Sequence, residues 1–199
     1  MSTESDAAGL HALVLAAGGS SRFGSAKQLV RIGDRPLLTL ICGRAAEVVG
    51  HALIVVLGAG AAELAPLLKH SPGSVVVNRS WREGLASSIR AGVARLPASC
   101  AGVMLVLADQ ACVTADDLRR LAGAWRRQPS CIAAASYGST VGVPTIFPQH
   151  LFGELSELKG DTGARALLRR HVDRLVKVPM ASAAFDLDTP DDLLELNKP

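Results

Sequence analysis

The chain alternates short, continuously apolar runs with longer stretches in which apolar residues recur at helical spacing. The apolar runs at 12–15, 53–57 and 102–107 are typical of strands that are buried on both faces of a sheet. After Pro36, large apolar residues recur every three or four positions to about residue 49, which predicts a helix. This alternation predicts an α/β domain with a mostly parallel sheet.

Weaker patterns of the same two kinds fill the rest of the chain. They predict further strands at 74–77, 131–136, 141–147 and 175–178. Amphipathic spacing, capping residues and prolines predict further helices at 61–70, 84–96, 114–128, 149–158 and 166–171, and after Thr189. The chain shows no internal repeat and no linker, so we expect a flexible tail at 1–9 and one domain at 10–199.

The composition indicates a folded globular protein and argues against several kinds of partner. Of the 199 residues, 49% are hydrophobic and 20% are charged, which suits a domain with a proper core. A net charge of +3 is too small to indicate nucleic-acid binding, although it allows a small basic site for an anionic ligand. No apolar run reaches the roughly 20 residues of a membrane span, and the polar first residues are unlike a signal peptide.

The cysteines and histidines form no pattern that indicates a metal site. The four cysteines lack CxxC spacing, and the five histidines lack the spacing of metal ligands. We interpret the cysteines as reduced, mostly buried thiols, and therefore expect a cytoplasmic protein.

The most informative stretch follows the first apolar run, where residues 15–29 read LAAGGSSRFGSAKQL. Glycine lets a backbone approach a polyphosphate closely, and exposed N–H groups together with Arg22 and Lys27 would neutralise its charge. The loop is not a P-loop, because Lys27 stands three residues after Gly24, and it is not GxGxxG. The residues alone predict either a phosphate-binding loop or a polar turn between a strand and a helix.

This stretch resembles LAAGxSxRMGxxK, the signature of the MobA-like nucleotidyltransferases, with Phe23 in place of the usual Met. The resemblance implies a single three-layer Rossmann-like domain of the nucleotide-diphospho-sugar transferase type. It also implies that Lys27 and Arg22 are catalytic, because they would stabilise the charge that builds up as pyrophosphate leaves. The loop would wrap the triphosphate of a nucleotide with Leu15, Ala16, Ala17, Gly18, Gly19 and Ser20.

A second motif, NRSWREGLASSI, occupies residues 78–89. Its glycine and serines predict a helix start that either holds a polar edge of a ligand or is an ordinary cap of weak helix formers. In the resembled family this segment lines the nucleobase and ribose pocket, and the matching residues here are Asn78, Gly84, Ser87 and Ser88. Trp81 also matches, and both an apolar lid and base stacking stay open for it.

Carboxylates at two distant positions are candidates for holding Mg²⁺. Asp109 directly follows the strand at 102–107, and ligands of open α/β sheets bind at that end of a strand. Asp186 and Asp188 are two residues apart, so on a strand they would point the same way. Each could instead be part of a turn or a helix start. The family carries similar LADQP and DxDTPED motifs, which implies that Asp109 and a carboxylate of the second motif hold the metal. For that second carboxylate, Asp188 is the first choice and Asp186 the second.

The resemblance also implies a site for an acceptor substrate. The motif LADQ is followed here by Ala111, where the family has Pro, and GDTGAR at 160–165 is similar to the molybdenum cofactor cytidylyltransferase branch. From the residues alone, GDTGAR is equally the entry of an ordinary helix capped by Asp161 or Thr162. The residues that match the acceptor side of the family are Gln110, Gly142, Pro144, Gly160, Asp161, Gly163 and Arg165.

By resemblance, the expected reaction transfers CMP from CTP to the terminal phosphate of the molybdenum–molybdopterin cofactor, with Mg²⁺, and releases pyrophosphate. The acceptor phosphate is already a nucleophile, so catalysis depends on positioning and charge neutralisation and needs no general base. One alternative is a guanylyltransferase or a sugar- or alditol-phosphate nucleotidyltransferase on the same fold. Another is a non-catalytic accessory factor that delivers the cofactor to a molybdenum hydroxylase.

Overall fold

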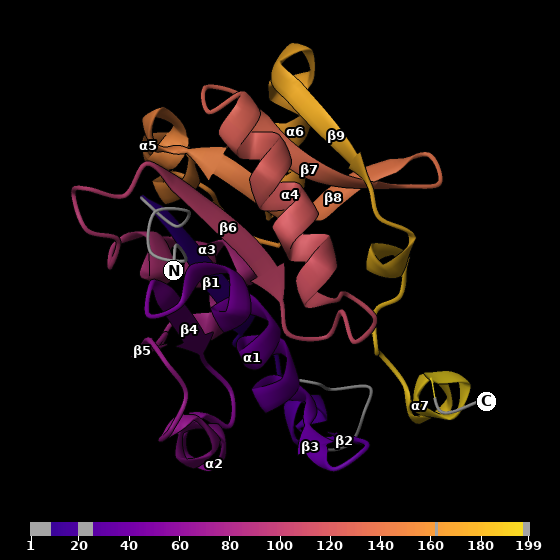
Figure 1. The fold of residues 1–199 in the computed structure, drawn as a ribbon. Helices are drawn as coiled ribbons and strands as arrows, with labels where there is room; N and C mark the ends of the chain where they lie inside the picture. The colour runs from indigo at the N-terminus through magenta and orange to yellow at the C-terminus, as the bar shows by residue number, and fades with distance from the viewer. Residues whose placement is uncertain (1–8, 20–25, 162, 197–199) are drawn as a thin grey trace, which may run out of the picture.

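The computed structural model describes residues 9–19, 26–161 and 163–196, and its centre is a sheet of seven strands (Figure 1). The strand order is β5-β4-β1-β6-β8-β7-β9. Helices cover both faces of this sheet, so the predicted three-layer α/β architecture is confirmed. The expected tail at 1–9 lies outside the described residues except for Gly9.

The apolar runs of the sequence form the centre of the sheet. All five residues of β4 and all but one residue of β1 are buried, as expected for strands covered on both faces. A small ribbon of β2 (Arg31–Ile32) and β3 (Arg35–Pro36) lies apart from the sheet. The seven strands are β1 (Leu10–Ala16), β4 (Leu53–Leu57), β5 (Ser74–Val77), β6 (Gly102–Leu107), β7 (Ile132–Tyr137), β8 (Thr140–Pro148) and β9 (Leu175–Pro179).

The strand β8 is the one member of the sheet that runs against its neighbours. It pairs antiparallel with β6 on one side and with β7 on the other, whereas the remaining pairs are parallel. Because two antiparallel steps restore the direction, β7 runs parallel to β6. The carboxyl ends of β1, β6 and β7 therefore lie at the same edge of the sheet, which is mostly parallel, as predicted.

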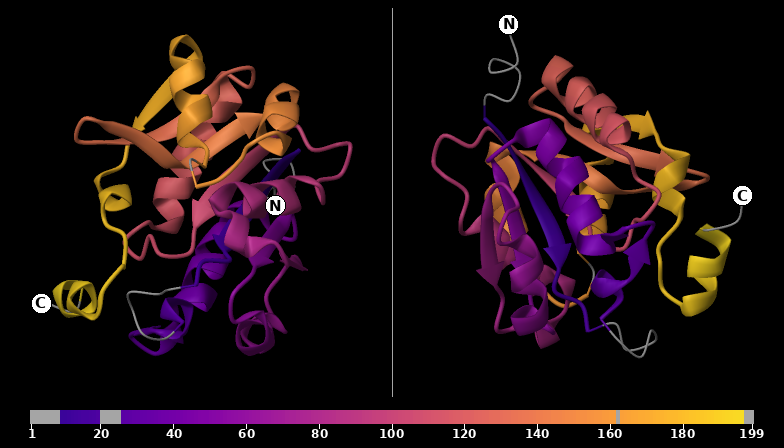
Figure 2. Two further views of the ribbon diagram at one scale, coloured as in Figure 1. Left: turned by 180° about the vertical axis from the view of Figure 1, so that it is seen from behind. Right: turned by 60° about the horizontal axis from the view of Figure 1, so that its bottom comes forward.

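Each face of the sheet has its own helices and its own apolar core. In Figure 1, α1 (Leu37–Val49) and α4 (Ala115–Arg127) lie in front of the sheet. The opposite face, seen from behind in Figure 2, carries α3 (Leu85–Val93), α5 (Phe152–Ser156) and α6 (Arg165–Arg170). No helix in the described ranges combines the length and the apolar character needed to cross a membrane.

Two predicted helices are shorter than expected, and each is completed by 3₁₀ turns. The helix expected at 61–70 is α2 (Ala61–Leu64), followed by a 3₁₀ segment at Ala65–Leu68. Pro66 lies in that segment and has no N–H to donate, which disfavours a continued α-helix. The helix expected at 149–158 begins with 3₁₀ turns at Gln149–Leu151 before α5.

The segment at 185–189 is irregular, so the strand on which Asp186 and Asp188 would point the same way is not formed. It follows a 3₁₀ turn at Ala181–Ala184 and leads into α7 (Pro190–Leu196). The N–H of Leu187 donates to the carbonyl oxygen of Asp109 at 2.9 Å. This bond and the buried side chain of Leu187 hold the segment against the end of β6.

Candidate active site

A cleft of about 420 Å³ lies at the carboxyl edge of the sheet. In the register of the strands, Leu15 lies beside Leu107, so the chain leaves β1 and β6 at neighbouring points. Ligands of open α/β sheets bind at such an edge. The cleft is lined by residues 15–19, 27–28, 81–82, 84–85, 88, 107–109 and 161.

Gln28 holds the loop that follows β1. Its side chain is only 2% exposed, and its Nε2 donates to the carbonyl oxygens of Ala16 and Gly18, each at 3.3 Å. Both carbonyl oxygens therefore have a buried amide as their partner, and the backbone on either side of Ala17 is fixed at the edge of the cleft. Gln28 was not among the predicted site residues, although it directly follows Lys27, which was predicted to be catalytic.

Trp81 forms a wall of the cleft against two glycines. A Cβ on Gly19 would lie 3.2 Å from the Trp81 ring, and a Cβ on Gly58 would lie 2.6 Å from Trp81 Cβ and 2.7 Å from the oxygen of Ala17. The guanidinium of Arg82 lies 4.5 Å from the centre of the Trp81 ring. Gly58 was not among the predicted site residues. Its position directly after a buried strand was the one local feature that indicated a place near the cleft.

Lys27 stands between two carboxylates at the floor of the cleft. Its Nζ lies 2.6 Å from Asp109 Oδ2 and 3.0 Å from Asp188 Oδ1. Burial by itself would lower the pKa of Lys27, but the charges and hydrogen bonds of the two carboxylates outweigh it and raise that pKa above its usual value. The ammonium group is therefore charged at neutral pH.

The two oxygens of the Asp109 carboxylate have different surroundings. Its Oδ1 is buried and has no hydrogen-bond partner in the described part of the chain. A buried carboxylate oxygen left in this state is costly, and a cation is a ligand that would relieve the cost. The described residues contain no group of three or more His, Cys, Asp or Glu that could hold a metal. Two carboxylates, water and phosphate oxygens are instead a donor set that suits Mg²⁺.

Asp186 lies close enough to Asp109 and Asp188 for their charges to act on it, and as a residue it is exposed. Its carboxyl group is partly shielded from water by the atoms around it. This loss of hydration, and then the charges of Asp109 and Asp188, raise the pKa of Asp186 to about 6. The positive charges of Lys27 and Arg165 act in the opposite direction. Of the two aspartates in the carboxyl-terminal segment, Asp188 is the one that forms an ion pair with Lys27.

A buried hydrogen-bond network supports the wall opposite the carboxylates. The amide of Asn78 donates to Ser87 Oγ at 2.8 Å and to Ser88 Oγ at 3.0 Å, and its Oδ1 accepts from the N–H of Ser80 at 2.9 Å. Ser87 Oγ donates onward to the carbonyl oxygen of Gly84 at 2.8 Å. Ser88 lines the cleft, whereas Asn78 and Ser87 hold the loop at 78–84 from behind.

Gly84 brings the loop at 160–163 against the start of α3. Its φ is +100°, and a Cβ there would lie 2.2 Å from Asp161 Oδ1 and 2.8 Å from Gly160. Asp161 Oδ1 accepts from the N–H of Leu85 at 3.3 Å, and the Gly160 oxygen accepts from the N–H of Ala86 at 3.1 Å. Asp161 therefore caps α3, and the capping of α6 by Asp161 that the sequence allowed is not seen.

Three residues predicted on the acceptor side lie in the interior. Gln110 is 1% exposed, and its amide donates to the oxygens of Val143 at 2.9 Å and Ala183 at 3.2 Å. Gly142 and Pro144 are buried within β8. Gln110 ties β8 to the segment after β6, and none of the three residues lines the cleft.

The remaining predicted residues fall into two groups. Ser20 and Arg22 lie outside the described residues. Gly163 is buried with a φ of +51°, and a Cβ there would lie 2.8 Å from Leu85. Arg165 is exposed at the start of α6, where its charge acts on the Asp186 carboxyl.

The glycines at 18–19 and the half-buried Lys27 lie at the carboxyl edge of an open α/β sheet, which is where folds of this class bind their ligands. The chain belongs to the MobA-like NTP transferase family, because the model of the MobA-like NTP transferase domain matches residues 12–175. The resemblance drawn from the motifs is thereby confirmed.

Individual relatives agree with this assignment in length and fold. Nicotine blue oxidoreductase from Paenarthrobacter nicotinovorans is 30% identical over 92% of this chain and 94% of its own. The crystal structure of Rv0371c from Mycobacterium tuberculosis is 33% identical, with a TM-score of 0.77 over 96% of this chain and 98% of its own. A manganese complex of Rv0371c is 32% identical, with a TM-score of 0.73 over 94% and 96% of the two chains.

Proposed function

We propose that the protein transfers CMP from CTP to the terminal phosphate of the molybdenum–molybdopterin cofactor. The observation that carries the proposal is Lys27, held between Asp109 and Asp188 at the floor of a cleft that a glycine-rich loop lines. Family membership supports nucleotide transfer. The similarity of GDTGAR to the cytidylyltransferase branch supports CTP and the molybdenum-containing acceptor.

In this reaction an oxygen of the acceptor phosphate attacks the α-phosphorus of CTP, and the bond to the leaving pyrophosphate breaks. The loop after β1 binds the triphosphate through its backbone, and Lys27 supplies positive charge where the leaving group develops negative charge. The two carboxylates restrict the positions of the long Lys27 side chain, so its charge is oriented before the substrate arrives.

Asp109 and Asp188 would hold Mg²⁺, as the unpartnered Oδ1 of Asp109 favours. When bound, the ion would neutralise charge on the triphosphate. The manganese complex of Rv0371c supports the use of a divalent cation within the family. Since Lys27 holds the same two carboxylates, the lysine and the ion would share them.

The test is pyrophosphate release from purified protein with Mg²⁺. CTP, GTP, ATP and UTP are supplied in turn, each with and without molybdenum cofactor. We expect release with CTP and with none of the other three nucleotides, and only when the molybdenum cofactor is present. Release with GTP would assign the protein to the guanylyltransferases. Binding of the cofactor without release from any nucleotide would assign it to the accessory factors.

A second candidate function comes from the printed name of one relative. Nicotine blue oxidoreductase is described as a redox enzyme, and it covers nearly the whole of this chain at 30% identity. If this chain is also an oxidoreductase, it will consume NADH or NADPH in the presence of a dye acceptor and without nucleoside triphosphate. Oxidation of neither cofactor, together with pyrophosphate release, would exclude this candidate.

A further inference from the structure

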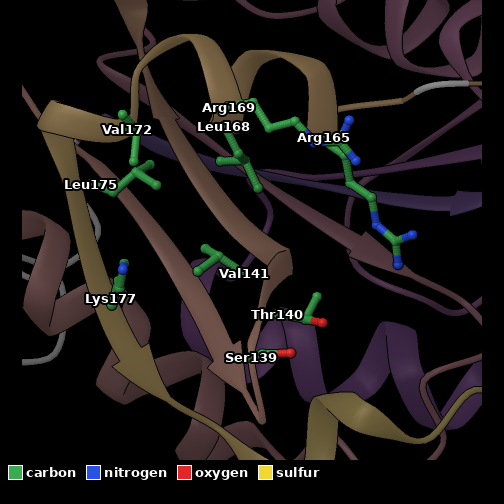
Figure 3. Close-up of a pocket in the computed structure, with 9 residues that line it drawn as sticks. All are labelled: Ser139, Thr140, Val141, Arg165, Leu168, Arg169, Val172, Leu175 and Lys177. Atoms are coloured by element: carbon green, nitrogen blue, oxygen red, sulfur yellow. The ribbon is translucent and has the colours of Figure 1, made fainter.

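A second cavity, of about 390 Å³, lies between α6, β9 and the turn that joins β7 to β8 (Figure 3). We name it the α6–β9 cavity. Its lining combines two hydroxyl side chains of the turn, three cations and four apolar residues. None of these residues lines the nucleotide cleft. A cavity of this size is within the range of small-molecule sites.

The cations of the α6–β9 cavity are Arg165, Arg169 and Lys177. Arg165 and Arg169 are four residues apart on α6 and so share one face of the helix. Within the described residues, none of the three forms a salt bridge, and no acidic side chain lines the cavity. By contrast, the adjacent Arg170 is paired with Glu154 at 2.6 Å. The three charges are thus available to an anionic ligand.

The segment that supplies the three cations of the cavity is itself basic. Between residues 165 and 177, five of the 21 Lys and Arg side chains stand against one Asp. This segment therefore carries a charge of +4, whereas the whole chain carries +3. A local charge of this sign raises the concentration of small anions near the cavity.

The floor of the cavity is apolar. Leu168 is buried, and Val141 and Leu175 pack at the edge of the core on this face of the sheet. Val172 is 56% exposed and is one of the few large apolar side chains left at the surface. An apolar floor beneath a cationic rim is complementary to a molecule that has a ring at one end and a negative charge at the other.

Hydroxyl groups complete the rim at the carboxyl edge of the sheet. Ser139 and Thr140 are exposed in the turn after β7, and Figure 3 shows Arg165 reaching from α6 towards Thr140. A phosphate or carboxylate at this point would have both charged and neutral donors beside it.

We propose that the α6–β9 cavity is a second ligand site, separate from the nucleotide cleft, for a small ring compound that carries a phosphate or carboxylate. Arg169, Lys177 and Arg165 bind the anion, and Val172 with the apolar floor contacts the ring. The site does not depend on the identity of the transferred nucleotide. Its existence is therefore tested separately from the proposed reaction.

The experiment is isothermal titration calorimetry of the full chain with four probes. Phenyl phosphate combines a ring with a phosphate, benzoate combines a ring with a carboxylate, and inorganic phosphate and phenol each supply one part. Phenyl phosphate should bind most tightly, and benzoate should reveal whether a carboxylate suffices. Equal affinity for phenyl phosphate and inorganic phosphate would overturn the role of the apolar floor.

Variants identify where the probe binds. The double variant Arg169→Gln, Lys177→Gln should weaken phenyl phosphate binding by about tenfold or more. The matched control Lys69→Gln, Arg95→Gln removes two exposed charges elsewhere and should leave binding unchanged. Val172→Glu, at an exposed position, should also weaken binding without loss of the fold, as its melting temperature would show.

Saturating CTP with Mg²⁺ should leave the affinity for phenyl phosphate unchanged. Displacement of the probe by CTP, together with full binding by the double variant, would place the probe in the nucleotide cleft and overturn the proposal. No binding of either ring compound would overturn it as well. A failure of pyrophosphate release would leave these results unaffected.

Discussion

Lys27 and Asp109 form an ion pair of 2.6 Å although 82 positions separate them in the sequence. Asp188 joins them from the carboxyl-terminal segment, with its Oδ1 at 3.0 Å from Lys27 Nζ. One ammonium group thus connects the segment after β1, the end of β6 and the approach to α7. The charged centre of the cleft exists only once these three segments have folded together.

Lys27→Ala should lower kcat for pyrophosphate release by about 100- to 1,000-fold, because the cation at the centre of the cleft is lost. Initial rates with CTP and molybdenum cofactor measure the effect, and circular dichroism checks that the fold is retained. Lys69→Ala, which removes an exposed lysine far from the cleft, is the matched control. Turnover close to that of the control would refute the assignment.

Lys27→Met should bind Mn²⁺ about tenfold more tightly than the unaltered protein when no nucleotide is present. The lysine ammonium and a divalent cation would share the same two carboxylates and repel each other, so removal of the ammonium charge favours the metal. Electron paramagnetic resonance of free Mn²⁺ measures the affinity, with Lys69→Met as the control. Equal affinities would show that the metal does not use Asp109 and Asp188.

Gly84→Ala should lower the free energy of unfolding by about 1–3 kcal/mol, because alanine is strained at a φ of +100° and its Cβ would meet Asp161. Urea denaturation followed by circular dichroism measures this loss. Gly153→Ala is the matched control, since Gly153 lies within α5 with no atom within 4 Å of an added Cβ. Equal losses in the two variants would contradict the proposed contact.

Nucleotide binding should change the fluorescence of Trp81, which lines the cleft. The other tryptophan, Trp125, is 4% exposed and lies against Gly102, outside the cleft. The change on addition of CTP and Mg²⁺ should therefore disappear in Trp81→Phe and persist in Trp125→Phe. The opposite pattern would move the nucleotide away from the loop after β1.

Asp117 contributes stability that depends on pH. Burial would raise its pKa, but hydrogen bonds from the Thr114 backbone, the Ser182 and Thr114 hydroxyls and Arg120 lower it below the ordinary 3.8. A lowered pKa in the folded state makes this contribution complete above the unfolded pKa and removes it as the pH falls through the folded pKa. The carboxylate also completes the capping box that begins α4.

Asp117→Asn should therefore cost about 1 kcal/mol of unfolding free energy at about pH 7. The difference from the unaltered protein should shrink steadily as the pH falls below about 4. Urea denaturation across this range measures it. Asp116→Asn, at the exposed neighbouring position, is the control. A difference that grew in acid would contradict a lowered pKa of Asp117 in the folded state.

Local patterns in the sequence were sufficient to predict the layers of the fold and part of the cleft. Continuous apolar runs mark β1, β4 and β6 because these strands are buried on both faces. Once those strands are placed side by side, the residues that follow them must meet at one edge. The positions of Lys27 and Asp109 in the cleft follow from this geometry.

Contacts that depend on distant packing were not predictable from the same patterns. Gln28 was not predicted as a site residue, because nothing local shows that its amide binds the backbone of Ala16 and Gly18. For Asp161 the sequence allowed either an acceptor-binding role or a cap of the helix that follows it, yet its Oδ1 accepts from the N–H of Leu85 at the start of α3. The irregular path at 185–189 is held by distant partners, the Asp109 backbone and the Lys27 side chain, and these contacts do not change the local spacing of residues.

The insertion of β8 between β6 and β7 has a consequence for the newly made chain. β6 ends at Leu107, but the strand that pairs with its outer edge begins only at Thr140. While α4 and β7 are being synthesised, an apolar strand has one row of backbone groups without a partner, and such edges promote aggregation. A chain truncated after α4 should therefore be insoluble, even though it contains Lys27 and Asp109. The second half of the sheet protects the first during synthesis.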